Sequence, residues 1–264
     1  MRDSLAAHAT LGRELGWSLD LSIGSTRFQI LFPDEGLHRL AAERYRAFEA
    51  AEGPAFPIRL LDAREAASAS ADFSFKWQGA TLRCRREDAV FSGVRNEYAL
   101  DSLLRVLLSW TLLPQKGFLL HAATIVRGGR AFVFTGPSGA GKSTLASLAP
   151  EGTVLTDEIS LLRQESAEWS AFGTPFWGEF HADGKSVHAK VAGIFQLLQA
   201  PHNRVLPMSP ADAVRMLLPN VLFFSKDTEA SRRLLDLLAR LAQSVPCYRF
   251  EFRRDASLWE ALPA

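Results

Sequence analysis

The clearest chemical signature in the sequence is a loop of small residues that ends in lysine and serine. It matches the pattern G-x-x-x-x-G-K-[ST] in full, as Gly136-Pro137-Ser138-Gly139-Ala140-Gly141-Lys142-Ser143, and Thr144 follows. The loop comes after a predicted strand and begins a predicted helix, the context in which such a loop binds phosphate. Its backbone N–H groups can turn toward phosphate oxygens, and the helix N-terminus adds partial positive charge. We expect it to bind the phosphates of a nucleoside triphosphate, with Lys142 at the β- and γ-phosphates and the Ser143 hydroxyl on Mg²⁺.

Three acidic or basic side chains flank this loop. The apolar stretch "TVLTDEI" carries Asp157 and Glu158, and His121 begins the strand one hairpin before the loop. A carboxylate beside a phosphate loop can hold Mg²⁺ through water, and a second can accept a proton from a hydroxyl or orient water. The spacing does not decide which carboxylate has which role. A solvated strand end and a structural histidine are the alternatives.

Absent motifs narrow the choice among nucleotide-binding proteins. The sequence has no N-K-x-D motif for guanine and no L-S-G-G-Q motif of a transporter ATPase. These absences disfavour a GTPase and a transporter ATPase, but they leave a plain ATP hydrolase open.

The remaining sequence predicts the elements that position these residues. Apolar residues alternate at 17–23, 28–32, 56–60, 73–77 and 82–84, and a helical face runs through 37–48. Residues 1–95 are therefore expected to form a small α+β sheet domain, with 63–72 as a loop. A helix over 96–113 leads into a second domain at 96–264, where Gly128-Gly129 predicts a hairpin turn between two strands. Strands are expected at 159–164, 168–173, 191–200, 203–209 and 247–253, with "VAGIFQLLQA" and "NRVLPMS" as a pair, and helices near 142–148, 210–218 and 229–243.

Composition restricts the classes of partner. The chain has 264 residues, is 47% hydrophobic and 22% charged, and has a formal net charge of +1. A charge this close to zero does not support nucleic-acid binding. The apolar windows are too short and too charged to cross a bilayer. Cys84 and Cys247 have no spacing typical of a disulfide framework or metal site, so we expect reduced thiols in a cytoplasmic protein.

The segment "HAATIVRGGRAFVFTGPSGAGKSTLA…VLTDEI" resembles the C-terminal catalytic domain of HPr kinase/phosphorylase and its relatives encoded beside modified-peptide genes, including those of lasso peptides. The family pattern is a histidine that opens a strand, a hairpin, the phosphate loop, and a strand that ends in two acidic residues. His121, Lys142, Ser143, Asp157 and Glu158 match it in order. The clear resemblance covers about 119–162, and a looser one extends to the end of the chain.

The resemblance implies a compact P-loop fold shared with phosphoenolpyruvate carboxykinase. It also implies Mg²⁺- and ATP-dependent phosphorylation of a serine on a protein or peptide. The family's general base is the second of two aspartates, a position held here by Glu158. A family glutamate that binds Mg²⁺ has its nearest counterpart in Glu179, for which a surface-loop role is the alternative.

The sequence thus predicts a serine kinase with a catalytic set of His121, Lys142, Asp157 and Glu158. Mg²⁺ ligands are expected at Ser143, Asp157 and Glu179. An ATP hydrolase or phosphorylase, a small-molecule kinase and a nucleotide-binding module without chemistry are the alternatives. The substrate and the oligomeric state, a homo-oligomer included, stay open. Residues 1–95 either recruit the peptide along a sheet edge or cap the catalytic domain.

Two further stretches are interpreted as structural. "HADGKSVHAK" contains His181, Asp183 and His188, but it lacks the i, i+4 pairing of a helical zinc site. Arg204 is expected at the surface beside a strand.

Overall fold

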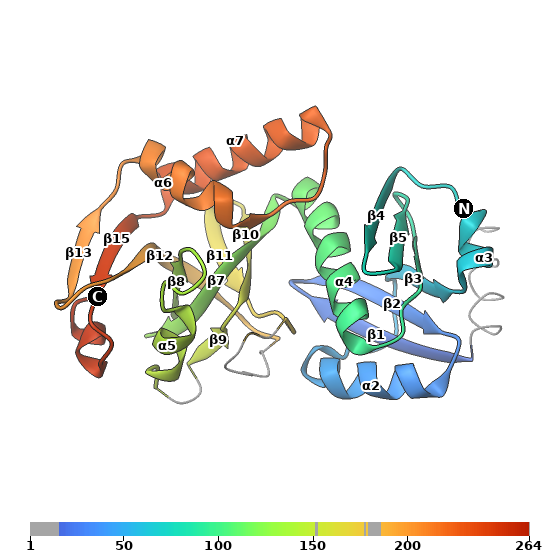
Figure 1. The fold of residues 1–264 in the computed structure, drawn as a ribbon. Coiled ribbons are helices and arrows are strands. Elements are labelled where there is room, and N and C mark those ends of the chain that lie inside the picture. The colour runs from blue at the N-terminus through green and yellow to red at the C-terminus, as the bar shows by residue number, and fades with distance from the viewer. Residues whose placement is uncertain (1–15, 151–152, 177, 179–185, 264) are drawn as a thin grey trace. The chain divides into compact units, whose positions relative to one another are not determined.

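The structure of this chain is a computed structural model, and it describes residues 16–150, 153–176, 178 and 186–263 (Figure 1). It is a mixed α/β structure with two β-sheets. The chain divides into two compact units, Met1–Leu107 and Leu108–Ala264. Each unit contains one of the sheets, and helix α4 (Glu97–Leu112) contains the point of division.

The first unit contains a sheet with the strand order β1-β2-β3-β6-β5-β4, six strands in the part of the chain that is described. Only the β2–β3 and β3–β6 pairs are parallel. Strand bounds are β1 (Trp17–Ile23), β2 (Thr26–Phe32), β3 (Phe56–Leu61), β4 (Phe73–Trp77), β5 (Ala80–Cys84) and β6 (Ala89–Ser92). The alternation in β1 buries Leu19, Leu21 and Ile23 on one face, as its sequence pattern predicts.

The helices α2 and α3 of the first unit begin at acidic caps. The Asp34 carboxylate accepts a hydrogen bond from the Leu37 N–H at 2.8 Å and begins α2 (Glu35–Tyr45), which a short 3₁₀ turn, η1 (Arg46–Phe48), follows. The prediction that 63–72 is a loop is wrong for its first half, because α3 occupies Ala63–Ala67. A capping box formed by Asp62 and Glu65 stabilises this short helix.

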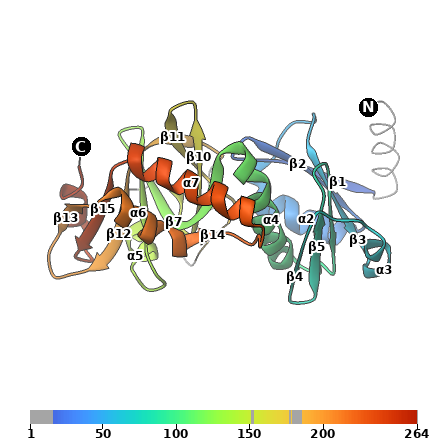
Figure 2. The same cartoon turned by 90° about the horizontal axis from the view of Figure 1, so that it is seen from above.

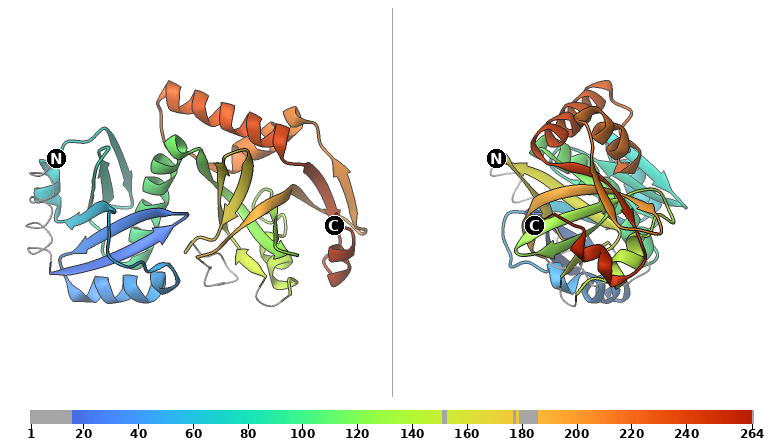
Figure 3. Two further views of the ribbon diagram at one scale, coloured as in Figure 1. Left: turned by 180° about the vertical axis from the view of Figure 1, so that it is seen from behind. Right: turned by 90° about the vertical axis from the view of Figure 1, so that its left-hand side faces the viewer.

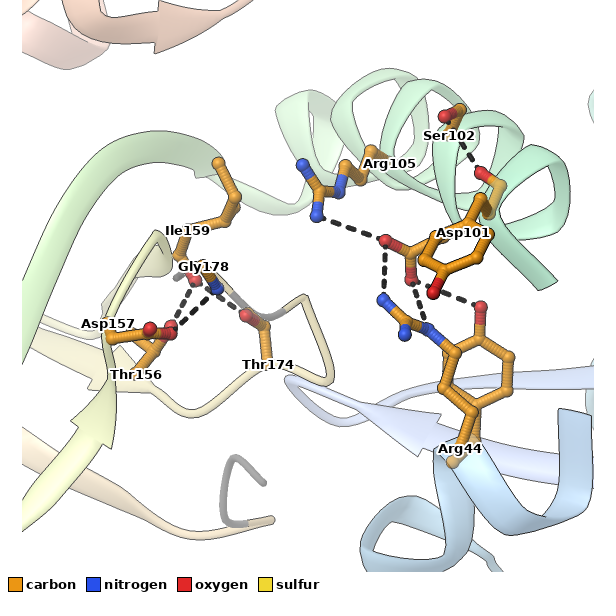
Figure 4. A network of polar contacts seen from close by, with 11 residues as sticks. Arg44, Asp101, Ser102, Arg105, Thr156, Asp157, Ile159, Thr174 and Gly178 are labelled. Carbon is orange, nitrogen blue, oxygen red and sulfur yellow. Dashed lines mark hydrogen bonds and ion pairs between the residues drawn. The ribbon is translucent and has the colours of Figure 1, made fainter. Parts of the chain in front are cut away.

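A buried carboxylate ties α4 to α2 in this unit (Figure 4). Asp101 is 4% exposed. It forms ion pairs with Arg44 at 3.1 Å and Arg105 at 3.0 Å, and it accepts a hydrogen bond from the Tyr45 hydroxyl at 3.2 Å. The two guanidinium groups compensate the cost of burying this charge.

The second unit contains a sheet with the order β11-β10-β7-β8-β12-β15-β13; β9 and β14 also pair with β7, which makes nine strands among the residues described. The strands are β7 (Gly117–Arg127), β8 (Arg130–Thr135), β9 (Val154–Thr156), β10 (Ile159–Glu165), β11 (Glu168–Phe172), β12 (His188–Gln199), β13 (Arg204–Pro207), β14 (Val221–Leu222) and β15 (Cys247–Phe252). A 3₁₀ turn, η2 (Leu113–Gln115), precedes β7. The hairpin between β7 and β8 turns at Gly128 and Gly129, whose φ angles are 53° and 75°, as the glycine pair predicts.

The central strands of this sheet run parallel. β12 pairs in parallel with β8 on one side and with β15 on the other. The prediction that the segments of β12 and β13 pair with each other is wrong. β13 pairs antiparallel with β15 instead, because β15 lies between them in the sheet.

Helices cover the two faces of this sheet (Figures 2 and 3). Leucines at 234, 237, 238 and 241 form an apolar stripe on α7 (Thr228–Ser244) and join one core cluster with Val133 and α6 (Pro210–Leu217). A short 3₁₀ turn, η3 (Leu218–Asn220), follows α6. Neighbouring Phe132 and Phe134 point to the other face, where they pack with α5 (Lys142–Ser147) and the 3₁₀ turn η4 (Ala256–Glu260). No helix in the described ranges is long and apolar enough to cross a membrane.

Candidate functional site

The glycine-rich loop, the histidine and the acidic pair all line one pocket of the second unit. Its volume is about 720 Å³. The lining residues are His121, Ser138, Gly139, Gly141, Lys142, Ser143, Thr144, Asp157, Glu158, Gly178 and Arg254. Residues more than a hundred positions apart in the sequence therefore meet at the carboxyl ends of the parallel strands β8 and β15.

The conformation of the loop depends on glycine and on two neighbouring strands. Gly139 and Gly141 have φ angles of 78° and 109°, a region that residues with a Cβ rarely adopt. A Cβ at Gly141 would lie 2.6 Å from Cζ of Phe252, at the end of β15. The Gln199 side-chain amide, at the end of β12, donates a hydrogen bond of 2.7 Å to the Gly139 carbonyl. The loop is thus held between the ends of β12 and β15.

Lys142 lies at the base of the pocket. It is 7% exposed, and its Nζ donates hydrogen bonds to the carbonyl oxygens of Gly136 at 2.9 Å and Pro137 at 3.2 Å. Burial lowers the pKa of Lys142, and the nearby Glu158 carboxylate opposes that shift. Cation and carboxylate therefore interact across the pocket.

The acidic pair interrupts an otherwise continuous strand. β9 and β10 both pair with β7, and the Thr156–Thr124 pair of β9 is in register with the Ile159–His121 pair of β10. The two acidic residues fill the gap between these pairs, and the register of β9 shifts only beyond Thr124. The Glu158 carbonyl accepts a hydrogen bond from the Ala122 N–H at 2.9 Å. The chain thus continues along β7 past the acidic pair, whereas the sequence suggested a strand that ends there.

Buried hydroxyl groups fix the backbone around this pair (Figure 4). Thr156 and Thr174 both donate to the Ile159 carbonyl, at 3.0 Å and 2.5 Å. Asp157 is 3% exposed, and its Oδ1 accepts a hydrogen bond of 3.0 Å from the Gly178 N–H. A Cβ at Gly178 would lie 3.0 Å from the other Asp157 oxygen, so glycine is what allows this close approach.

His121 lies on β7 and lines the pocket together with the loop and the acidic pair. Its carbonyl accepts a hydrogen bond of 2.9 Å from the Thr135 hydroxyl at the end of β8. The register of β7 with both β8 and β10 therefore sets the position of the imidazole, which lines the pocket.

Most of the sequence-predicted site residues meet in this pocket, but some do not line it. Gly136, Pro137 and Ala140 form the turn beneath it, where the Ala140 N–H donates to the Pro137 carbonyl at 3.1 Å. Glu179, the predicted third Mg²⁺ ligand, lies outside the described residues.

Two residues that line the pocket, Gly178 and Arg254, are not predicted by the sequence. A glycine in "FWGEF" and an arginine in "FRRDAS" belong to no motif, so no signal in the sequence alone marks them.

The stretch from His181 to Lys190 is described only from Ser186 onward. His188 stacks on Phe172 with ring centroids 5.0 Å apart, and His181 and Asp183 fall outside the described residues. No group of three or more His, Cys, Asp or Glu side chains gathers among the residues with described positions. Arg204 is exposed beside β15, as predicted.

Comparisons with known proteins place the chain in a family. No curated protein matches the sequence. Among solved structures, an HPr(Ser) kinase/phosphatase from Coxiella burnetii matches at 18% identity over 47% of this chain and 97% of that one, with a TM-score of 0.26, too low to establish a common fold. The protein-family model for "SynChlorMet cassette protein ScmC" matches residues 99–263, more than half of the chain and all of the described pocket. The chain therefore belongs to the ScmC family of SynChlorMet cassette proteins.

Proposed function

We propose that this protein is a Mg²⁺- and ATP-dependent kinase that phosphorylates a serine hydroxyl on a peptide or protein. The observation that carries the proposal is the meeting of Lys142 and Ser143 with Asp157 and Glu158 in one pocket. A phosphate loop supplies nucleotide binding, and a carboxylate beside it supplies a base for a hydroxyl.

The residues present fit a nucleotide phosphate and its metal. Positive φ angles at Gly139 and Gly141 turn the loop backbone inward, as a phosphate cradle requires. Mg²⁺ in such sites takes one or two protein oxygens and completes its shell with phosphate and water. The Ser143 hydroxyl and the Asp157 carboxylate would hold it, and the metal would neutralise charge on the transferring group.

The environments of the two carboxylates suggest different roles. The Gly178 N–H fixes Asp157, which is nearly buried, so its orientation suits a metal ligand. Glu158 is more exposed and faces Lys142, which suits a base that a substrate must reach. In the proposed reaction Glu158 accepts the serine proton while the serine oxygen bonds to the γ-phosphorus. The bond from that phosphorus to ADP breaks, which leaves phosphoserine and ADP.

The remaining groups assist this transfer in the proposed scheme. Lys142 exchanges its bonds to the Gly136 and Pro137 carbonyls for the β- and γ-phosphates and stabilises their charge. His121, which lines the same pocket, orients the γ-phosphoryl group.

The family name bears on the choice of substrate. A cassette protein is encoded with partners, so the products of the neighbouring genes are the first substrates to test. In the first unit, β4 is an edge strand and Trp77 on it is 49% exposed. An extended peptide could add to such an edge through main-chain hydrogen bonds. Photo-crosslinking of a neighbouring precursor peptide to the whole chain tests this recruitment role, and crosslinks that avoid residues 73–84 would contradict it.

The decisive experiment follows the γ-phosphate of radiolabelled ATP with the whole protein and each neighbouring gene product. A kinase leaves the label on a serine, whereas a hydrolase releases it only as free phosphate. Lys142→Ala should abolish transfer in a protein that keeps its folded circular-dichroism spectrum. Transfer at the wild-type rate in this variant would overturn the assignment.

Two substitutions separate base from metal ligand. Glu158→Gln should keep Mg²⁺–ATP affinity and lower the rate by about 10²–10⁴-fold, as removal of a general base does. Asp157→Asn should instead raise the Mg²⁺ concentration required. If the two variants exchange these phenotypes, the roles are reversed.

A further inference from the structure

Arg254 is a basic residue of the pocket that belongs to no recognised motif. It comes two residues after Phe252, the last residue of β15, whose ring lies against the loop glycine Gly141. Its side chain is exposed and lines the pocket together with Ser138, Gly139 and Lys142. The end of β15 therefore brings a guanidinium group to the rim of the phosphate loop.

The backbone around Arg254 is fixed on both sides. The Arg253 N–H donates to the Asn203 side-chain oxygen at 2.8 Å. The Asp255 N–H donates to the Arg253 carbonyl at 2.9 Å, and the Asp255 carboxylate caps η4 through the Ser257 N–H at 3.0 Å. The backbone that carries Arg254 is therefore held in place, so little backbone entropy is lost when its side chain binds a ligand.

The neighbouring arginine provides a contrast. Arg253 forms an ion pair with Asp255 and does not line the pocket. The Arg254 guanidinium makes no ion pair with any side chain in the described ranges. Two adjacent arginines thus differ in one respect that matters: the first is engaged within the turn, and the second faces the pocket.

We propose that Arg254 binds the terminal phosphate of the nucleotide held by the loop, an inference that rests on the proposed function. A guanidinium matches two phosphate oxygens with parallel N–H donors, which a single ammonium group cannot do. Lys142 reaches that group from the base of the pocket and Arg254 from the rim. The pocket then has two fixed cations for the charge that spreads over the phosphoryl oxygens during transfer.

The test measures affinities rather than turnover alone. Titration of the whole protein with Mg²⁺–ATP, Mg²⁺–ADP and Mg²⁺–ADP plus aluminium fluoride, a mimic of the transferring phosphoryl group, gives three dissociation constants. In Arg254→Ala the ratio of ATP to ADP affinity should fall by about 10- to 100-fold, the loss typical of a hydrogen bond to a charged group. Aluminium fluoride should increase the affinity for Mg²⁺–ADP in the wild-type protein, and this increase should fall at least as much in Arg254→Ala. Arg254→Lys should restore part of the ratio, because it keeps the charge and loses the paired donors.

Arg253→Ala is the matched control, because it removes the same charge one residue away. If Arg253→Ala lowers the ratio of ATP to ADP affinity as much as Arg254→Ala does, the change reflects a loss of positive charge near the pocket and not a contact made by Arg254. That result would overturn the proposal. An Arg254→Ala variant that weakens ATP and ADP equally would also overturn it, since the contact would not be to the terminal phosphate.

The same measurements keep this proposal distinct from the proposed function. A wild-type protein that binds Mg²⁺–ATP but transfers no phosphate contradicts the kinase activity alone, and the affinity ratio of Arg254→Ala still decides the role of Arg254. A wild-type protein that binds neither nucleotide overturns both.

Discussion

Substitution of Gly141 by alanine tests whether the end of β15 sets the shape of the phosphate loop. Alanine at φ 109° is strained, at a cost of about 1–2 kcal/mol for a left-handed residue. Its Cβ would also lie 2.6 Å from the Phe252 ring, and overpacking of this kind costs about 1–3 kcal/mol. We expect Gly141→Ala to lower the free energy of unfolding of the second unit by about 2–5 kcal/mol.

A double-mutant cycle separates the two contributions. Phe252→Leu removes the Cζ atom that alanine would meet, so in that background Gly141→Ala should cost only the strain, about 1–2 kcal/mol. Gly139→Ala is the control within the same loop, since Gly139 has a φ of 78° and nothing within 4 Å of an added Cβ. It should cost about 1–2 kcal/mol in either background.

The assay is urea denaturation monitored by circular dichroism. Calorimetry of thermal unfolding then assigns the transition of the second unit separately from that of the first. We expect a coupling energy of about 1–3 kcal/mol between positions 141 and 252. If the costs of Gly141→Ala agree within about 0.5 kcal/mol in the two backgrounds, the Phe252 ring does not constrain the loop, which would refute this prediction.

Three further perturbations address other parts of the structure. Gly178→Ala should displace the acidic pair, because its Cβ would lie 3.0 Å from an Asp157 oxygen; we expect a lower transfer rate with unchanged ADP affinity, and an unchanged rate would contradict this. Burial raises the pKa of both Cys84 and Cys247 to about 12. The stability that these neutral thiols confer is therefore complete below about pH 9 and is lost as the pH rises toward 12, which urea midpoints between pH 8 and pH 11 should reveal as a decline. Asp101→Ala leaves two partly buried arginines without their carboxylate and should destabilise the first unit by about 3–5 kcal/mol, measured by calorimetry; a loss below about 1 kcal/mol would show that the network is dispensable.

The sequence was sufficient to predict most of the elements, because each has a local pattern. Alternation predicts β1 and β2, and the 3.6-residue period predicts α7. The short helix α3 was missed although Asp62 and Glu65 carry a capping-box signal, since a stretch rich in alanine and serine resembles a loop. Strand β6 is not predicted either, because it is only four residues long and all four are buried, so it shows no alternation of apolar and polar residues.

Strand partners depend on contacts that no local pattern encodes. Nothing in the residues of β12 or β13 shows that β15 separates them, since pairing is decided by the packing of the whole sheet. The same limit applies to the site. The phosphate-loop motif identifies Lys142 and Ser143 from the sequence. Arg254 belongs to no motif and lines the pocket because β15 ends beside the loop.

This dependence on the last strand has a consequence for the order of events during synthesis. The hydrogen bond from Gln199 to Gly139 spans 60 residues of sequence, and Phe252 lies still further along the chain. Contacts of this separation form late, after the segments that they join have left the ribosome. A nascent chain that has been synthesised past the phosphate loop but not past β15 therefore contains the loop sequence without the contacts that hold the loop in shape. ATP can stabilise the finished second unit but not its unfinished precursor, so we expect bound nucleotide to favour completion of the sheet rather than its start.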